Sequence, residues 1–268
     1  MSSKKNILAA VVLAAAVFAP QSAPAAPQAA TAPAAAAATG ISLPSLSSPQ
    51  DAGNALKWVA LVTVLSVAPA VAILMTCFTR IVVVLGLLRQ AMATNQLPPN
   101  QVLFGLALLM TVVVMSPVYS AVYRDGIEPY LAGRAQGEAA LAAGAAPVRT
   151  FMIRQIEASN SQNDVVLFLD AKQSEASRAG KLTWKDVPTP AVIAAFVVSE
   201  LKTAFWIGFR VYLPFLVVDL LVASVLTSMG MLMMPPVMVS IPFKLLLFVL
   251  ADGWHLVVGT LMQSFAQG

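Results

Sequence analysis

The residues of this sequence that could do chemistry are few. One cysteine, Cys77, excludes a disulfide within the chain and a metal site built from several cysteines. One histidine, His255, leaves little for a zinc site or a serine–histidine hydrolase. No GxSxG motif, HExxH motif or paired-aspartate constellation is present. We therefore expect no catalytic residue, no cofactor and no metal.

The charged residues of the C-terminal third are the more informative group. Four of them interrupt the apolar run 191–229, namely Glu200, Lys202, Arg210 and Asp219. Lys244 and Asp252 follow in the next run. A charge that faces lipid costs several kcal/mol, so these side chains need partners. Three interpretations stay open: they form ion pairs, with Arg210 a candidate to neutralise Asp219 or Asp252; they fix helix register; or they relay protons.

A methionine-rich segment lies between these charges, in the stretch GMLMMPPVMVSIPFK from Gly230 to Lys244. Five of the chain's 12 methionines fall within ten residues: 229, 231, 233, 234 and 238. Pro235 and Pro236 predict a loop, because proline ends a helix. Methionine is unbranched and flexible and repacks around irregular surfaces. Several copies about an axis would close a pore, although an interfacial loop or core filler is the other interpretation.

The composition indicates which elements must position these residues. The chain has 268 residues, of which 59% are hydrophobic and 10% charged, and its mean hydropathy is +0.81. A soluble domain is about 25% charged, so this is a membrane-class protein. The net charge of +4 is dispersed, which gives no basic patch for nucleic acid.

Lys4, Lys5 and a following apolar segment predict a signal peptide over 1–25. An Ala/Pro-rich disordered tether is expected over 26–54.

The remaining chain predicts an all-α, membrane-associated fold. Apolar regions at 56–88, 102–123, 191–229 and 241–265 predict a first helical hairpin over 55–123 and a second over 191–268. A small extracytoplasmic, periplasmic helical insertion is expected over 124–190. Two regions are too long for a bilayer core of about 30 Å, so we expect long bent hairpins with kinks at Pro69 and Pro214. A single chain of this size cannot shield so many charges alone, so we also expect an oligomer.

Four motifs carry a resemblance to a known family: FTRIVVVLGLLRQA, PPNQVLFGLALLMT, SELKTAFWIGFRVYLPFLVVDLLVAS and MGMLMMPPVMVSIPFKLLLFVLADGW. They resemble the FliP family of flagellar type III export-gate proteins over about 56–261. The resemblance implies a homo-oligomeric ring with FliQ and FliR, assisted by FliO, with FlhA and FlhB docked nearby. It also implies a multi-pass inner-membrane protein of the flagellar basal body, not an enzyme, that passes unfolded flagellar subunits outward.

The resemblance also implies roles for individual residues. The methionine gasket of the family falls on Met231, Met233 and Met234. A polar pair between neighbouring subunits falls on Glu200 and Lys244. An exit constriction falls on two phenylalanines, Phe151 and Phe168.

A second function remains open from the residues alone. An ion-coupled small-molecule transporter would use carboxylates within its membrane spans, here Glu200, Asp219 and Asp252. Such transporters favour internal structural repeats, and the two halves of this sequence show no convincing repeat.

Overall fold

The computed structural model describes residues 49–94, 98–170, 183–231 and 233–266, and within these residues every regular element is helical. The predicted all-α fold is therefore confirmed. The chain divides into two compact units, residues 1–72 and 73–268. The predicted signal peptide and most of the predicted tether, 26–48, lie outside the described residues.

The described part of the first unit, residues 49–72, lies wholly within helix α2, Pro49–Leu74, so the last six residues of the predicted tether are helical. Its stretch Leu56–Leu74 is long and apolar enough to cross a membrane. The hydroxyls of Thr63 and Ser66 donate to carbonyls four residues earlier, at 2.8 Å each. These bonds satisfy the polar side chains inside the helix, as a lipid environment requires. Pro69 lies within α2 and does not end it.

The first apolar region is broken at a place the sequence did not indicate. The break falls at residues 75–77, after the end of α2, rather than at Pro69. The second unit then holds the remaining elements: α3 (Phe78–Ala91), α4 (Asn100–Val122), the π-turn η1 (Tyr123–Ile127), α5 (Glu128–Leu131), α6 (Gly137–Ala158), α7 (Gln162–Val166), α9 (Thr189–Ser228), α10 (Pro236–Leu250) and α11 (Gly253–Ala266).

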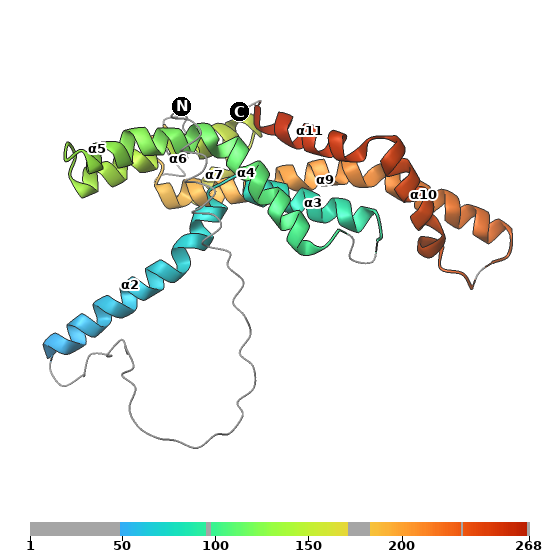
Figure 1. Ribbon diagram of the computed structural model, residues 1–268, viewed down its shortest axis with the longest axis horizontal. Coiled ribbons are helices and arrows are strands. Elements are labelled where there is room, and N and C mark those ends of the chain that lie inside the picture. The colour runs from blue at the N-terminus through green and yellow to red at the C-terminus, as the bar shows by residue number, and fades with distance from the viewer. Residues whose placement is uncertain (1–48, 95–97, 171–182, 232, 267–268) are drawn as a thin grey trace, which may run out of the picture. The chain divides into compact units, whose positions relative to one another are not determined.

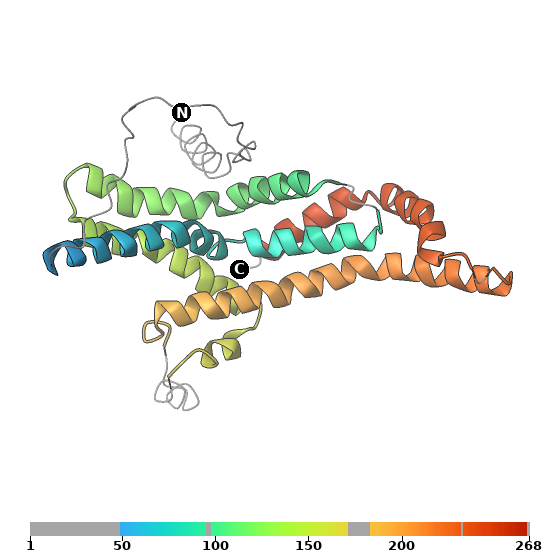
Figure 2. The same cartoon turned by 90° about the horizontal axis from the view of Figure 1, so that it is seen from below.

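The core of the second unit forms where α3 lies along α9, with α4 and α6 packed beside them (Figures 1 and 2). Helix α3 buries Ile81, Val84, Leu85 and Leu88, which recur at the three- and four-residue spacing of one helix face. Burying each such side chain contributes about 1.5–3 kcal/mol. Small residues of α9, Ala195 and Ala204 among them, let the two helices approach closely.

The predicted insertion over 124–190 is continuous with the helices on its N-terminal side. Helix α4 runs through η1 into α5, so helix continues past the expected boundary at Arg124. Arg124 and Asp125 form an exposed ion pair at 2.9 Å within η1. Helix α6 buries Phe151, Met152 and Ile156 in the common core.

The crossing of η1 and α6 depends on a glycine. A Cβ atom at Gly126 would lie 2.7 Å from Cα of Gly144 and 3.0 Å from the carbonyl oxygen of Ala140. Both neighbours are backbone and cannot rotate away.

Gly126→Ala is expected to destabilise the protein by about 1–3 kcal/mol through overpacking. Thermal unfolding in detergent measures this. The matched control is Gly105→Ala, where a Cβ meets nothing within 4 Å; an equal loss in both variants would contradict the packing argument.

The C-terminal helices complete the second unit. Helix α9 is continuous through Pro214 and spans 40 residues, which is about 60 Å of helix. Helices α10 and α11 are bent by 63° at a short break that contains Asp252, whose φ is 48°. Stretches Asn100–Leu131 and Thr189–Ser228 are long and apolar enough to span a membrane, and the bent α10–α11 pair could form one further span.

Cys77 provides a simple check of this core. Its side chain is fully buried, and burial raises the pKa of the thiol from 9.0 to about 12. The native protein is therefore expected to resist a thiol-directed maleimide at pH 8 and to react only after denaturation. Because the unfolded thiol ionises first, stability attributable to this group falls as pH rises above 9. Rapid labelling of the native protein, followed by mass spectrometry, would contradict this burial.

Candidate functional site

A buried arginine lies at the meeting point of four helices. Arg80 of α3 is 1% exposed and contacts Glu200 of α9, which is fully buried. The guanidinium donates to both carboxylate oxygens, with Nε 2.9 Å from Oε2. Nη2 also donates to Oε1 of Gln155 on α6, at 3.0 Å. Nη1 donates to the carbonyl oxygen and to Oγ of Ser264 on α11, at 3.1 Å each.

This arrangement, which we call the arginine hub (Arg80, Gln155, Glu200 and Ser264), uses every donor of the guanidinium. An arginine offers five N–H groups in a fixed fork, and five contacts are made here. The Phe265 ring also lies over the guanidinium, 4.1 Å from its carbon to the ring centroid. A fully satisfied charge can remain buried, whereas one stripped of its partner cannot. The hub therefore fixes α3, α6, α9 and α11 relative to one another.

A second buried cation links α10 to α9. Lys244 is 2% exposed, and its Nζ lies 2.7 Å from Oδ2 of Asp219. Nζ also donates to the carbonyl oxygen of Ala91, the last residue of α3, at 3.1 Å. Ser240 donates to the other carboxylate oxygen of Asp219. We call Asp219, Ser240 and Lys244 the lysine clamp. It joins the two arms of the hairpin formed by α9 and α10.

The methionine segment lies at the tip of that hairpin, beyond the clamp. Gly230, at φ 74°, ends α9 in the left-handed conformation that glycine adopts without strain. The amides of Gly230 and Met231 bond back to the carbonyls of Thr227 and Leu226, at 3.0 Å each. Pro236 then starts α10, where a missing N–H costs nothing. The methionines around the turn are exposed, and Met233 is 98% exposed.

The predicted pairing of Glu200 with Lys244 has no counterpart within this chain. Each has a different partner, Arg80 for one and Asp219 for the other. Sequence reasoning missed Arg80, because 120 positions separate it from Glu200. Arg89, on the same helix as Arg80, donates to Asn100. Pairing between two copies stays a prediction, but it would have to displace partners that already satisfy both charges.

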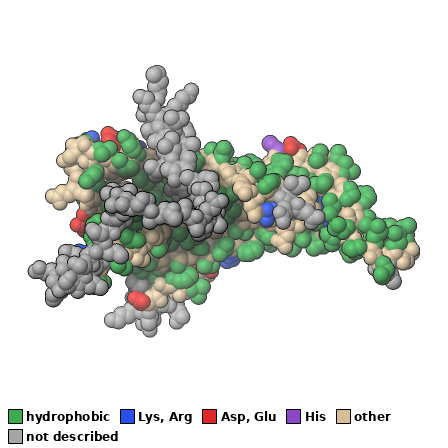
Figure 3. Space-filling view, turned by 60° about the horizontal axis from the view of Figure 1, so that its bottom comes forward, with side chains coloured by type: hydrophobic (Ala, Val, Ile, Leu, Met, Phe, Trp, Pro, Cys, Tyr) green, Lys and Arg blue, Asp and Glu red, His purple; other side chains and the backbone are tan. Residues whose placement is uncertain are grey.

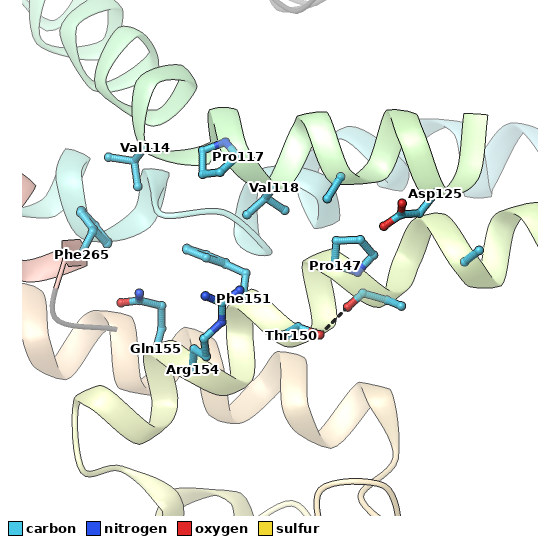
Figure 4. Close-up of a pocket in the computed structure, with 13 residues that line it drawn as sticks. Val114, Pro117, Val118, Asp125, Pro147, Thr150, Phe151, Arg154, Gln155 and Phe265 are labelled. Atoms are coloured by element: carbon cyan, nitrogen blue, oxygen red, sulfur yellow. Dashed lines mark hydrogen bonds between the residues drawn. The ribbon is translucent and has the colours of Figure 1, made fainter. Parts of the chain in front are cut away.

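The two predicted constriction residues lie in different surroundings. Phe151 is buried and meets Phe196 edge-on, with ring centroids 6.0 Å apart. It also lines a groove of about 480 Å³ between α4 and α6, which Figure 4 shows with Val118 opposite it. Phe168 follows α7 and is about 40% exposed. A constriction by these two residues therefore stays a prediction, in which Phe168 has the free ring and Phe151 a packed one.

The fold and these ion pairs together define a multi-pass, all-α membrane protein whose apolar helices carry buried charges. Within the described residues, no group of three or more histidine, cysteine or acidic side chains could hold a metal ion. The sequence adds the particular family. A sequence model of the FliP family matches residues 61–261, and the chain belongs to that family. The resemblance predicted from the motifs is confirmed.

Curated relatives agree with this assignment. Flagellar biosynthetic protein FliP of Bacillus subtilis (strain 168) is 45% identical over 225 residues, covering 84% of this chain and 98% of the relative. The protein of the same name from Caulobacter vibrioides is 47% identical over 213 residues, covering 80% and 77% of the two chains. That from Pectobacterium carotovorum is 48% identical over 205 residues, covering 76% of each.

Proposed function

We propose that this chain is a core pore subunit of the flagellar type III export gate, in the bacterial inner membrane. The relatives are named for flagellar biosynthesis, which supports a role in flagellar export. The observation that carries the pore itself is the exposure of Met231, Met233 and Met234 at the tip of a hairpin of two apolar helices. A side chain as exposed as Met233 has no core role in its own chain. Its apolar surface is available to other copies or to a passing polypeptide.

The chemistry of methionine fits a gate that must close and yield. A ring of apolar side chains excludes ions by dewetting when the pore is empty. Methionine has three rotatable bonds and no branch, so the ring can reshape around an unfolded chain. Three methionines per copy, Met231, Met233 and Met234, would form this gasket. The lysine clamp joins α9 to α10 next to the tip of the hairpin. It would therefore hold the methionines of each copy in a fixed position.

The partners of this gate are part of the proposal. A ring of several copies, assembled with FliQ and FliR and assisted by FliO, would surround the pore, with FlhA and FlhB docked nearby. Unfolded flagellar subunits would be its substrates. The chain would carry no catalytic residue of its own, so the energy for export would come from the rest of the apparatus.

The transporter interpretation is weakened by the ion pairs. Two of the three carboxylates it would use, Glu200 and Asp219, are engaged by Arg80 and Lys244. A proton relay needs carboxylates that are not held in fixed ion pairs, and Arg80 and Lys244 hold these two.

The mass of the detergent-extracted particle tests the proposal. The full chain would be co-expressed with candidate FliQ and FliR proteins and the purified particle weighed by native mass spectrometry. We expect one discrete complex with several copies of this chain. A monomer or dimer that ignores both partners would overturn the pore assignment.

A further inference from the structure

The hairpin of α9 and α10 has an apolar outer surface about as long as a bilayer core is thick. Residues 211–251 contain two charged side chains, Asp219 and Lys244, and the lysine clamp pairs them with each other. The α9 arm from 211 to 228 is about 27 Å long, against a hydrocarbon core of about 30 Å. The face in Figure 3 is mainly hydrophobic with scattered charges. Many large apolar side chains of the hairpin are exposed: Leu213, Leu216, Val217, Leu220, Leu221, Val225, Phe243, Leu246, Val249 and Leu250.

The open end of the hairpin, opposite the methionine tip, holds two charges without an ion-pair partner. Arg210 of α9 and Asp252 of the α10–α11 bend are both exposed, and neither lies within 4 Å of an opposite charge in the described residues. The Arg210 guanidinium lies over the Trp206 ring, 4.8 Å from its centroid. Trp254 follows Asp252 by two residues and is 40% exposed. Tryptophan and arginine at the end of an apolar span are typical of the level of the lipid headgroups.

A groove lies between α9 and the bend at this open end. Its volume of about 400 Å³ is within the range of about 300–1,000 Å³ that small-ligand sites have. Arg210 lines it on the α9 side, whereas Ala251 and Gly253, the two neighbours of Asp252, line the bend side. Among the described residues that line the groove, Arg210 is the one charged residue. Thr260 is the other polar one, and its hydroxyl already donates to a carbonyl of its own helix, at 2.7 Å.

This pattern of charge fits a zwitterion with an apolar tail. The headgroup of phosphatidylethanolamine carries a phosphate and a primary ammonium, joined by two carbons. A guanidinium binds phosphate through paired N–H groups, and a carboxylate accepts from an ammonium. Phosphatidylglycerol has the phosphate but offers Asp252 no cation. The trimethylammonium of phosphatidylcholine has no N–H to donate to Asp252.

We propose that the groove between α9 and the α10–α11 bend binds phosphatidylethanolamine. The phosphate lies against Arg210, the ammonium against Asp252, and part of one acyl chain lies in the apolar groove. The Trp206 ring holds the guanidinium in position for the phosphate. The bound lipid neutralises both unpaired charges where the hairpin leaves the hydrocarbon core. This site needs the membrane and one copy of the chain, so it goes beyond the proposed pore.

Native mass spectrometry of the full-length chain tests the choice of lipid. The chain would be purified in detergent, stripped of lipid and titrated with phosphatidylethanolamine, phosphatidylglycerol or phosphatidylcholine of identical acyl chains. We expect phosphatidylethanolamine to bind at least tenfold more tightly than either of the other lipids. Equal or tighter binding of phosphatidylglycerol would overturn the zwitterion site.

Two substitutions test the two charges separately. Arg210→Gln should weaken phosphatidylethanolamine binding at least tenfold, because the phosphate loses its cation. Asp252→Asn should abolish the preference over phosphatidylglycerol, and asparagine tolerates the φ of 48° at this position. Lys202→Gln, at an exposed cation of α9 that pairs with Asp164, is the control and should leave binding unchanged. Unfolding temperatures should match in all of these variants. A preference that survives Arg210→Gln and Asp252→Asn would overturn the site.

Photolabelling of the unmodified protein provides an independent readout. Phosphatidylethanolamine with a photoreactive group on one acyl chain would be added to the full chain co-expressed with candidate FliQ and FliR. We expect the label on peptides that contain residues 207–215 and 247–260. Labelling of α2 alone would overturn the site, because it would show lipid at a general apolar surface. An assembled ring that takes up no label there would also overturn it, because a second copy would then cover the groove.

The copy number, read from the same mass spectra, keeps this inference separate from the proposed function. A chain that binds phosphatidylethanolamine as expected but forms no ring would overturn the pore and leave the lipid site standing. A ring of normal mass without the lipid preference would do the opposite.

Discussion

Replacing Arg80 with alanine is expected to destabilise the protein by about 3–5 kcal/mol, because Glu200 would remain buried without a cation. The loss should appear as a large drop in the unfolding temperature in detergent and as loss of motility in soft agar. The double variant Arg80→Met with Glu200→Leu should recover much of the stability, since it removes both charges and keeps apolar volume. Arg89→Ala, a less buried arginine on the same helix, is the control and should change stability by about 0.5 kcal/mol or less.

A charge exchange at Glu200 and Lys244 distinguishes the ion pair within one chain from a pair between two subunits. If Glu200 pairs with Arg80, then exchanging the charges of Glu200 and Lys244 leaves both in the wrong surroundings. The double variant Glu200→Lys with Lys244→Glu should then be as defective as either single variant. Restored assembly in that variant would contradict the arginine hub and favour the pair between copies.

The lysine clamp gives the second large effect, with an asymmetry between its two partners. Asp219→Ala strands a fully buried ammonium, so the loss should fall within about 3–5 kcal/mol, at the lower end because Asp219 is partly exposed. Lys244→Met should cost less, since it leaves a carboxylate that water and Ser240 can reach. Unfolding temperatures of the two variants in detergent measure the order. The reverse order would show that the carboxylate, not the ammonium, is the desolvated partner.

Much of the fold could be predicted from the sequence, because long apolar runs have few stable solutions in a membrane. The turn between α9 and α10 followed from the two prolines after the methionines, whose backbone preferences are local. Helix ends that depend on tertiary contacts did not follow in this way. Helix continues from α4 past Arg124, where η1 packs against α6, and the break at 75–77 falls away from the expected Pro69.

The candidate site was predictable in its residues and not in its pairings. Glu200, Asp219 and Lys244 could be identified because charges in apolar runs need partners. Their partners are chosen by helix packing that joins positions 120 apart, as for Arg80 and Glu200, and spacing along the chain carries no signal of that. Gln155 and Ser264 were missed for the same reason, since neutral polar residues do not stand out in a sequence.

The ion conductance of the assembled complex tests the central claim, that the methionine tips seal a pore. Purified particles with Met231, Met233 and Met234 all replaced by alanine would be placed in planar bilayers beside the unmodified complex. We expect at least a tenfold higher resting conductance, because three long apolar side chains per copy are lost from the constriction. Met262→Ala, on α11 away from the tip, is the control and should leave the conductance unchanged. A triple variant that assembles normally and conducts no more than the unmodified complex would contradict the seal.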